Sequence, residues 1–306
     1  MFLLYYQYVP IENPSKMCKW QIQLCQELGL NGRIRVSKEG INGTLSGEDA
    51  NVESYICAMD ACDELNMNGK IDWKKSGLVQ NLRSHEEQYF QTLSVKVTKE
   101  VVSLDLTEKE ETILKTIPRG EHLSPLEFHA ALERYATSSN DTIASNDGIK
   151  NEVVMLDVRN IYETRIGKFD VNGSIEVIDP LTRKFSDVKG FIDANLERLK
   201  EKSVFMYCTG GVRCETASSY LKMKGVTDVY QLRGGIHAYM EAFPDGSGYF
   251  RGKNFVYDPR IAGDTCMGLY FSFLIVTFII SLILFKTLNS STSNVQRNNW
   301  QMPVLP

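Results

Sequence analysis

The segment from Tyr207 to Cys214 reads Tyr-Cys-Thr-Gly-Gly-Val-Arg-Cys and holds the types of residue that activate a thiol. Cys208 follows a short apolar run and precedes a segment predicted to be helical. Glycines allow the backbone to turn successive N–H groups inward, and a helix that begins here adds partial positive charge. Arg213 adds a full positive charge. Because each feature stabilises an anion, we predict that Cys208 is a reactive thiolate and that Arg213 is its catalytic partner. The active-site loop between them consists of Thr209, Gly210, Gly211 and Val212.

A structural role is the alternative interpretation of Cys208, because buried cysteines are common. The order strand, cysteine, two glycines, arginine and helix is much rarer, and it favours a reactive site. Cys214 also has two interpretations, as a resolving thiol for Cys208 or as a helix residue that only packs. The chain has seven cysteines spread over 306 residues, which is not a disulfide framework and indicates a reducing compartment.

Apolar strands alternate with helices around Cys208, which is the pattern of a parallel α/β sheet. We expect strands at 152–157, 203–207 and 229–232, and helices at 188–200 and from about 215 to 224. Another helix begins at Pro125, with Ser124 as its N-cap and Glu127 as the partner in a capping box. We place this domain at 124–262, after a charged linker at 106–123.

The first 105 residues predict a separate, smaller domain. Their order is β-α-β-β-α-β, which is typical of a ferredoxin-like (acylphosphatase-like) α+β sandwich. The expected strands are 3–9, 33–36, 44–46 and 93–97, and the expected helices are 14–28 and 48–62. The predicted fold class is therefore α/β, with the sandwich first and the parallel-sheet domain second.

The length of the active-site loop separates two kinds of cysteine chemistry. Cysteine phosphatases have five residues between cysteine and arginine, whereas four residues separate Cys208 from Arg213. The shorter loop resembles that of rhodanese sulfurtransferases. We expect Asp157, Arg159 and Glu163 to form structural ion pairs rather than to act as catalysts. Other segments similar to the rhodanese signature are 157–159, 162–163, 167–169, 173–175 and 232–235.

Two further motifs, at 32–47 and 252–258, resemble one rhodanese-containing family, the tRNA uridine hydroxylases, with eukaryotic thiosulfate sulfurtransferase/rhodanese-like relatives. The resemblance covers about residues 1–262. It implies that the wobble uridine of tRNA is converted to 5-hydroxyuridine with molecular oxygen, and that Cys208 is the active-site residue and a persulfide carrier. The family continues into paired cysteines with metal-ligand spacing. Only Cys266 remains here, so the sequence gives no four-ligand zinc site.

No cofactor is identifiable in the sequence, and we predict no bound metal. There is no flavin fingerprint, and the four histidines form no recognisable iron site with two histidines and one carboxylate. The sequence therefore shows no group that would activate oxygen. The four are His85, His122, His129 and His237.

The overall charge excludes a globally basic nucleic-acid-binding protein, since the formal net charge is −4. Residues 1–105 hold 11 Lys+Arg against 14 Asp+Glu, so contact with RNA would be local. Arg33, Arg35 and Lys38 are candidates, because the two arginines share one face of a predicted strand. An ordinary solvated strand face is an equally good interpretation.

The chain has no charged residue between Asp264 and Lys286. As a helix, residues 265–285 would extend about 31 Å, close to the ~30 Å core of a bilayer. We predict a transmembrane helix at 265–285 and a polar tail at 286–306, with a buried core helix as the alternative. A small excess of basic residues before the apolar run indicates that the catalytic region is cytoplasmic.

Three functional hypotheses follow. The first, from the family resemblance, is a tRNA uridine hydroxylase that uses Cys208. The second, from the loop chemistry alone, is a general sulfurtransferase in which Cys208 takes sulfane sulfur from thiosulfate or a persulfide and passes it to a thiol. The third is a membrane-tethered binding module without catalysis. The third is disfavoured because the chain keeps both Cys208 and Arg213.

Overall fold

The computed structural model describes residues 1–76, 90–137 and 152–254, all of which belong to one compact unit. Within these ranges, no helix is long and apolar enough to cross a membrane. The predicted span at 265–285, the tail at 286–306 and Cys266 lie outside the described residues. The membrane tether and its cytoplasmic orientation therefore stay predictions.

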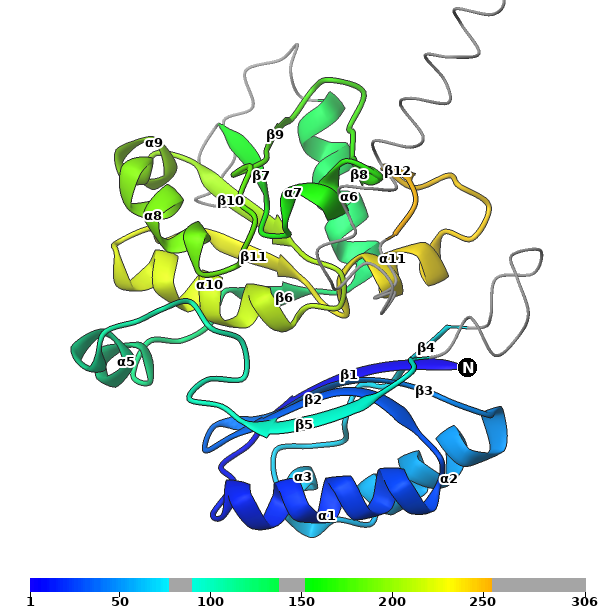
Figure 1. Ribbon diagram of the computed structural model, residues 1–306. Coiled ribbons are helices and arrows are strands. Elements are labelled where there is room, and N and C mark those ends of the chain that lie inside the picture. The colour runs from blue at the N-terminus through cyan, green and yellow to red at the C-terminus, as the bar shows by residue number, and fades with distance from the viewer. Residues whose placement is uncertain (77–89, 138–151, 255–306) are drawn as a thin grey trace, which may run out of the picture. The chain divides into compact units, whose positions relative to one another are not determined.

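The N-terminal domain is a five-stranded sheet with helices on one face (Figure 1). The strand order is β4-β1-β3-β2-β5, and the pairs β4·β1, β1·β3 and β3·β2 are antiparallel. These pairings confirm the predicted ferredoxin-like sandwich. The elements are β1 (Phe2–Tyr8), α1 (Pro14–Glu27), β2 (Asn31–Ser37), β3 (Gly40–Ser46), α2 (Asp49–Asp60), α3 (Asp63–Asn66), β4 (Lys74–Ser76) and β5 (Leu93–Val97).

The fourth strand of the sandwich was predicted wrongly. We assigned that place to residues 93–97, but the structure gives it to β4, which is only three residues long and polar. Residues 93–97 do form a strand, β5, which pairs in parallel with β2 at the opposite edge. A three-residue strand with the sequence Lys-Lys-Ser has no alternating apolar pattern, so the sequence carried no signal for it.

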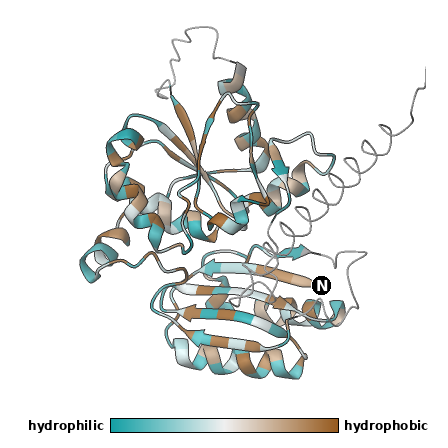
Figure 2. Cartoon of the chain, turned by 45° about the horizontal axis from the view of Figure 1, so that its top comes forward, coloured by the Kyte–Doolittle hydropathy of each residue, from teal (hydrophilic) through white to brown (hydrophobic). Residues whose placement is uncertain are grey.

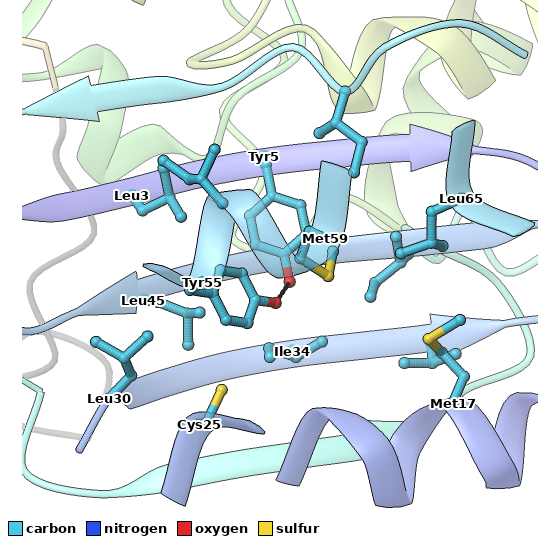
Figure 3. Close-up of a cluster of buried hydrophobic side chains, with 14 of the residues drawn as sticks. Leu3, Tyr5, Met17, Cys25, Leu30, Ile34, Leu45, Tyr55, Met59 and Leu65 are labelled. Carbon is cyan, nitrogen blue, oxygen red and sulfur yellow. Dashed lines mark hydrogen bonds between the residues drawn. The ribbon is translucent and has the colours of Figure 1, made fainter. Parts of the chain in front are cut away.

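The core of this domain lies between the sheet and its helices (Figure 3). Successive residues of a strand point to opposite faces, so Leu3 and Tyr5 of β1 point into this core. The hydroxyl of Tyr5 lies 2.5 Å from that of Tyr55 on α2, which satisfies two buried polar groups. Helix α1 begins at Pro14 after Asn13, whose side chain accepts a hydrogen bond from the backbone N–H of Lys16.

The second domain has a parallel sheet of order β6-β11-β10-β7-β9. The antiparallel pair β8·β12 lies beside it. The elements are α5 (Glu108–Leu114), β6 (Glu121–Leu123), α6 (Pro125–Thr137), β7 (Val153–Asp157), α7 (Ile161–Thr164), β8 (Gly167–Phe169), β9 (Glu176–Ile178), α8 (Asp187–Ala194), α9 (Leu196–Lys200), β10 (Ser203–Tyr207), α10 (Val212–Met223), β11 (Val229–Leu232), α11 (Gly235–Ala242) and β12 (Phe250–Gly252).

Both faces of the parallel sheet are covered, which explains the uninterrupted apolar strands (Figure 2). On one face, Val204 and Met206 of β10 pack against α8 and α10. On the other face, Phe205 and Tyr207 pack against α6 and α11. The central strand β10 is buried along its whole length, and it ends immediately before Cys208.

Three boundaries in this domain differ from the prediction. Strand β6 pairs with β11, although its residues were assigned to the linker. The helix expected at 188–200 is two helices, α8 and α9, which are divided at Asn195. Helix α10 begins at Val212 rather than at about 215, which brings its N-terminus to the active-site loop.

Candidate active site

Cys208 lies between the end of β10 and the start of α10, and its side chain is fully buried. The backbone N–H of Gly211 donates a hydrogen bond to its Sγ at 3.1 Å. Gly211 has φ +99°, a conformation that favours glycine, and it is the N-cap of α10. The loop therefore folds as predicted, with the sulfur at the N-terminus of a 12-residue helix.

The surroundings of Cys208 favour its thiolate. Burial is the largest influence and raises the pKa, but four effects outweigh it. The Cys214 thiol donates a hydrogen bond to the sulfur, the Arg213 charge attracts it, and the backbone N–H groups of Arg213 and Cys214 also lower the pKa, which is about 6. Most Cys208 is therefore ionised at neutral pH. Cys25, in the core of the N-terminal domain, shows the opposite, since burial alone raises its pKa to about 12.

Arg213 is held in place by Glu163 of α7. Two guanidinium nitrogens of Arg213 each lie 2.7 Å from a carboxylate oxygen of Glu163, which is a bidentate ion pair. The hydroxyl of Thr209 donates to Glu163 at 2.8 Å and accepts from Arg213 at 3.1 Å. Burial would raise the pKa of Glu163, but the Arg213 charge and the hydrogen bonds lower it.

The three residues predicted to form structural ion pairs therefore have two different roles. Arg159 and Asp157 are both fully buried and pair at 2.6 Å, and Arg159 also donates to the carbonyl of Gly167. They join the end of β7 to β8, as expected of structural residues. Glu163 instead positions the arginine of the active-site loop. The sequence showed the residue but not its partner.

The N-terminus of helix α11 forms hydrogen bonds to the same loop. The N–H groups of Ile236 and His237 donate to the carbonyls of Cys208 and Thr209 at 3.0 and 3.1 Å. A Cβ at Gly235 would lie 2.6 Å from the Cys208 carbonyl oxygen, and this glycine has φ +65°. The glycines at 234–235 were recognised as part of the rhodanese signature, but their close approach to the active-site loop was not predicted.

The N-terminal domain packs against the active-site loop, a contact that the sequence did not predict. A Cβ at Gly210 would lie 2.8 Å from Leu4 and 3.5 Å from the side chain of Lys74, and one at Gly211 would lie 2.9 Å from the hydroxyl of Tyr6. The Tyr6 hydroxyl donates to Glu215 of α10 at 3.2 Å. The alternation Leu4, Tyr6, Tyr8 on one face of β1 was the available signal, because it places aromatic hydroxyls on the face away from the core.

The candidate RNA contacts lie outside the active-site loop: two are on β2, and one is in the turn that follows it. Arg33 and Arg35 share one face of β2, as predicted. Lys38 lies in the turn after β2 and lines a cavity of about 840 Å³ together with Tyr8, Arg119 and Glu215. None of the residues 208–213 lines this cavity. The role of all three as RNA contacts stays a prediction.

Cys214 is fully buried, and its pKa is raised well above the usual value by burial and by its hydrogen bond to Cys208. It is therefore a neutral donor to a charged acceptor. Its role as a resolving thiol stays a prediction. In the part of the chain that the structure describes, no three His, Cys, Asp or Glu side chains cluster so that they could hold a metal ion.

Comparison with known proteins agrees with both domains. Residues 1–101 match the UPF0176 acylphosphatase like domain, and residues 143–242 match the Rhodanese-like domain. The chain is similar to the Arabidopsis thaliana rhodanese-like domain-containing protein 6, with 40% identity over 85% of this chain and 43% of that protein. It is also similar to tRNA uridine(34) hydroxylases of the aster yellows witches'-broom phytoplasma (38% identity, 86% of this chain, 74% of the relative) and of Staphylococcus aureus strain COL (36%, 86% and 72%).

Proposed function

The chain belongs to the tRNA uridine(34) hydroxylase family, and on that premise we propose that it hydroxylates the uridine at position 34 of tRNA through Cys208. The observation that carries the proposal is the thiolate of Cys208, with a pKa of about 6, held by N–H groups, Cys214 and Arg213. The net change replaces the hydrogen on C5 of the base with a hydroxyl group. The oxidant implied by the family resemblance is molecular oxygen: one of its atoms enters the base, and the other leaves as water after taking two electrons and two protons from an external reductant.

Two roles of Cys208 fit this proposal. As a nucleophile, the thiolate adds to the electron-poor C6 of the uracil ring and activates C5. As a carrier, it holds a reactive sulfur near the base. In both roles Arg213 stabilises negative charge beside the sulfur, and Glu163 keeps Arg213 in position.

The test is nucleoside mass spectrometry of tRNA from cells that lack the protein. We expect 5-hydroxyuridine and its derivatives to fall, and wild-type protein to restore them. Cys208→Ala should not restore them. The matched control is Cys25→Ala, which removes another fully buried cysteine that lies in the core of the N-terminal domain. Full rescue by Cys208→Ala would overturn the proposal.

A second candidate function is sulfur transfer, which the match to the Rhodanese-like domain favours. The Cys208 thiolate attacks the outer sulfur of thiosulfate, an S–S bond forms, and sulfite leaves with the electron pair. Arg213 and the loop N–H groups stabilise the charge of the resulting persulfide. Thiosulfate should add one sulfur atom to the Cys208 peptide in wild type and not in Cys208→Ser. Absence of that mass gain in wild type excludes this candidate.

A further inference from the structure

The sheet of the N-terminal domain contains no carboxylate. Its five strands hold five cationic side chains and no Asp or Glu, although residues 1–105 as a whole have more acidic than basic residues. The five are Arg33, Arg35, Lys74, Lys75 and Lys96. The sheet is therefore locally basic within an acidic domain, and the distribution of charge is more informative than the net charge.

Four of these cations lie on the same face of the sheet. Residues that pair directly across strands point to the same side. The first row across the sheet is Lys74, Leu4, Thr44, Arg33 and Ser94, and the second is Tyr6, Asn42, Arg35 and Lys96. We call Lys74, Arg33, Arg35 and Lys96 the basic face. Lys75 points to the other side, where it pairs with Glu53 of α2 at 2.7 Å.

The basic face begins at the active-site loop. Lys74 and Leu4 lie against Gly210, and Tyr6 lies against Gly211. Strands β3 and β2 follow β1 across the sheet, and neighbouring strands are about 4.8 Å apart. Arg33 and Arg35 on β2 are therefore about 10 Å from β1 along the face. A nucleotide at Cys208 would have its neighbours in the chain over β3 and β2.

The arginines of the basic face are held by neutral oxygen atoms, and no described residue forms an ion pair with them. Arg33 donates to the carbonyl and hydroxyl oxygens of Thr92, and its guanidinium lies 5.6 Å from the centre of the Phe90 ring. Arg35 donates to the carbonyl of Ile34 at 3.0 Å. Among the described residues, Arg33, Arg35 and Lys96 have no ion pair, whereas Lys74 pairs with Asp72 at 2.8 Å. The arginine N–H groups that are not used in these hydrogen bonds are suited to bind phosphate oxygens.

We propose that the basic face binds the sugar–phosphate backbone of single-stranded RNA beside the reacting uridine, with Arg33 and Arg35 as phosphate contacts. This inference rests on the proposed function for the identity of the base at Cys208. Charge complementarity selects the partner, because Arg33, Arg35 and Lys96 form no ion pair with any described residue and lie next to neutral polar side chains. An unpaired RNA loop suits the site better than a duplex, since its bases are free to reach Cys208.

The test measures binding of the full chain to a fluorescein-labelled RNA hairpin that has an anticodon loop with uridine at position 34, by fluorescence anisotropy over a range of salt concentrations. Arg33→Ala/Arg35→Ala should weaken binding about tenfold or more at low salt. The slope of log affinity against log salt should fall by about 1.4, since each single-strand phosphate contact contributes about 0.7. Arg33→Lys/Arg35→Lys keeps both charges and should retain most of that slope.

The matched control is Lys16→Ala/Lys19→Ala, which removes two exposed charges from α1, on the helical side of the same domain. It should bind within twofold of wild type. Equal weakening by the control and the arginine variant would overturn the proposal, as would an unchanged affinity of the arginine variant. Binding of polyglutamate or of a fully paired duplex as tightly as the hairpin, with the same dependence on Arg33 and Arg35, would also overturn it.

The outcomes separate this inference from the proposed function. If the protein hydroxylates tRNA and Arg33→Ala/Arg35→Ala raises KM without changing kcat at saturating tRNA, both stand. If hydroxylation occurs with unchanged KM in that variant, the basic face is excluded and the proposed function stands. If RNA binding depends on the two arginines but no 5-hydroxyuridine forms, the basic face stands and the proposed function fails.

Discussion

At the scale of single residues, the same side chain has opposite properties in the two domains. Cys25 and Cys208 are both fully buried, yet burial raises the pKa of Cys25 to about 12, and the pKa of Cys208 is about 6. The difference comes from donors and charges within a few residues of Cys208. Reactivity here is therefore a property of the loop and of the start of α10.

Cys214→Ala should raise the pKa of Cys208. The hydrogen bond from the Cys214 thiol is the largest influence that lowers this pKa, and a hydrogen bond to a charged group contributes about 1.5–3 kcal/mol. We expect the midpoint of the iodoacetamide alkylation rate against pH to rise by about 1 to 2. Mass spectrometry of the Cys208 peptide gives the rate at each pH. Cys18→Ala is the control and should leave the midpoint unchanged, so an equal shift in both variants would contradict this explanation.

Glu163→Gln should destabilise the protein by about 3–5 kcal/mol at pH 7, because it leaves the largely buried side chain of Arg213, which is 15% exposed, without its ion-pair partner. The pKa of Glu163 is below its usual 4.5 in the folded state, so its contribution is fully present above pH 4.5. It is lost as the pH falls through the lower folded value.

Urea unfolding at several pH values tests this. The gap between wild type and Glu163→Gln should shrink below pH 4.5, and a gap that stays constant would exclude this role of the ion pair. Glu197→Gln breaks an exposed pair with Lys200 and should change the free energy of unfolding by less than about 0.5 kcal/mol.

At the scale of elements, the start of α11 packs directly against the active-site loop. Gly235 brings the start of α11 so close that its N–H groups reach the carbonyls of the loop, and a Cβ there would meet three backbone atoms within 2.8 Å. The position of α11 therefore depends on Gly235. The hydrogen bonds from α11 hold the carbonyls of Cys208 and Thr209 in place.

Gly235→Ala should destabilise the protein by about 1–3 kcal/mol and slow the alkylation of Cys208 at pH 7. The added methyl group displaces the Cys208 carbonyl and strains a left-handed backbone. Gly190→Ala in α8 is the matched control, since a Cβ there meets nothing within 4 Å. It should stabilise the protein by about 0.5–1 kcal/mol, because alanine favours helix. Thermal unfolding that shows the same sign for both variants would contradict this prediction.

Elements with a local signal were predictable, and those fixed by distant contacts were not. Strand β10 and the capping box of α6 follow from neighbours in the chain, so they were predicted to within a residue or two. Strand β4 exists because β1 offers it an edge, and its own three residues carry no pattern. The contact of Tyr6 with Glu215 was not predictable either, because the two residues lie 209 positions apart in the chain.

At the scale of the whole molecule, the active site belongs to both domains. The Tyr8 hydroxyl lies 3.0 Å from that of Thr216 on α10, and Arg119 lies 4.2 Å from the centre of the Tyr8 ring. With Tyr6 on Glu215, these contacts hold β1 against α10 and keep Cys208 from solvent. Because Cys208 is fully buried in this arrangement, we expect access to its sulfur to require movement of β1 away from α10.

Tyr6→Phe/Tyr8→Phe should make Cys208 react several-fold faster with a bulky maleimide. The variant loses the hydroxyl contacts to α10 and keeps the rings, so the domains separate more easily. The control is Tyr220→Phe, which breaks a hydroxyl contact to Asp193 within the second domain and should leave the rate unchanged. Peptide mass spectrometry against time measures both rates. If only the control reacted faster, access to Cys208 would not depend on the hydroxyl contacts between β1 and α10.

The contacts between β1 and α10 join two segments that are synthesised at very different times. Tyr6 and Tyr8 leave the ribosome early, and their partners Glu215 and Thr216 follow more than 200 residues later. The N-terminal sandwich has its own core and so folds first, with its basic face bare. The rhodanese domain then folds against this surface, so the nascent chain carries the basic face before it carries the active-site loop around Cys208.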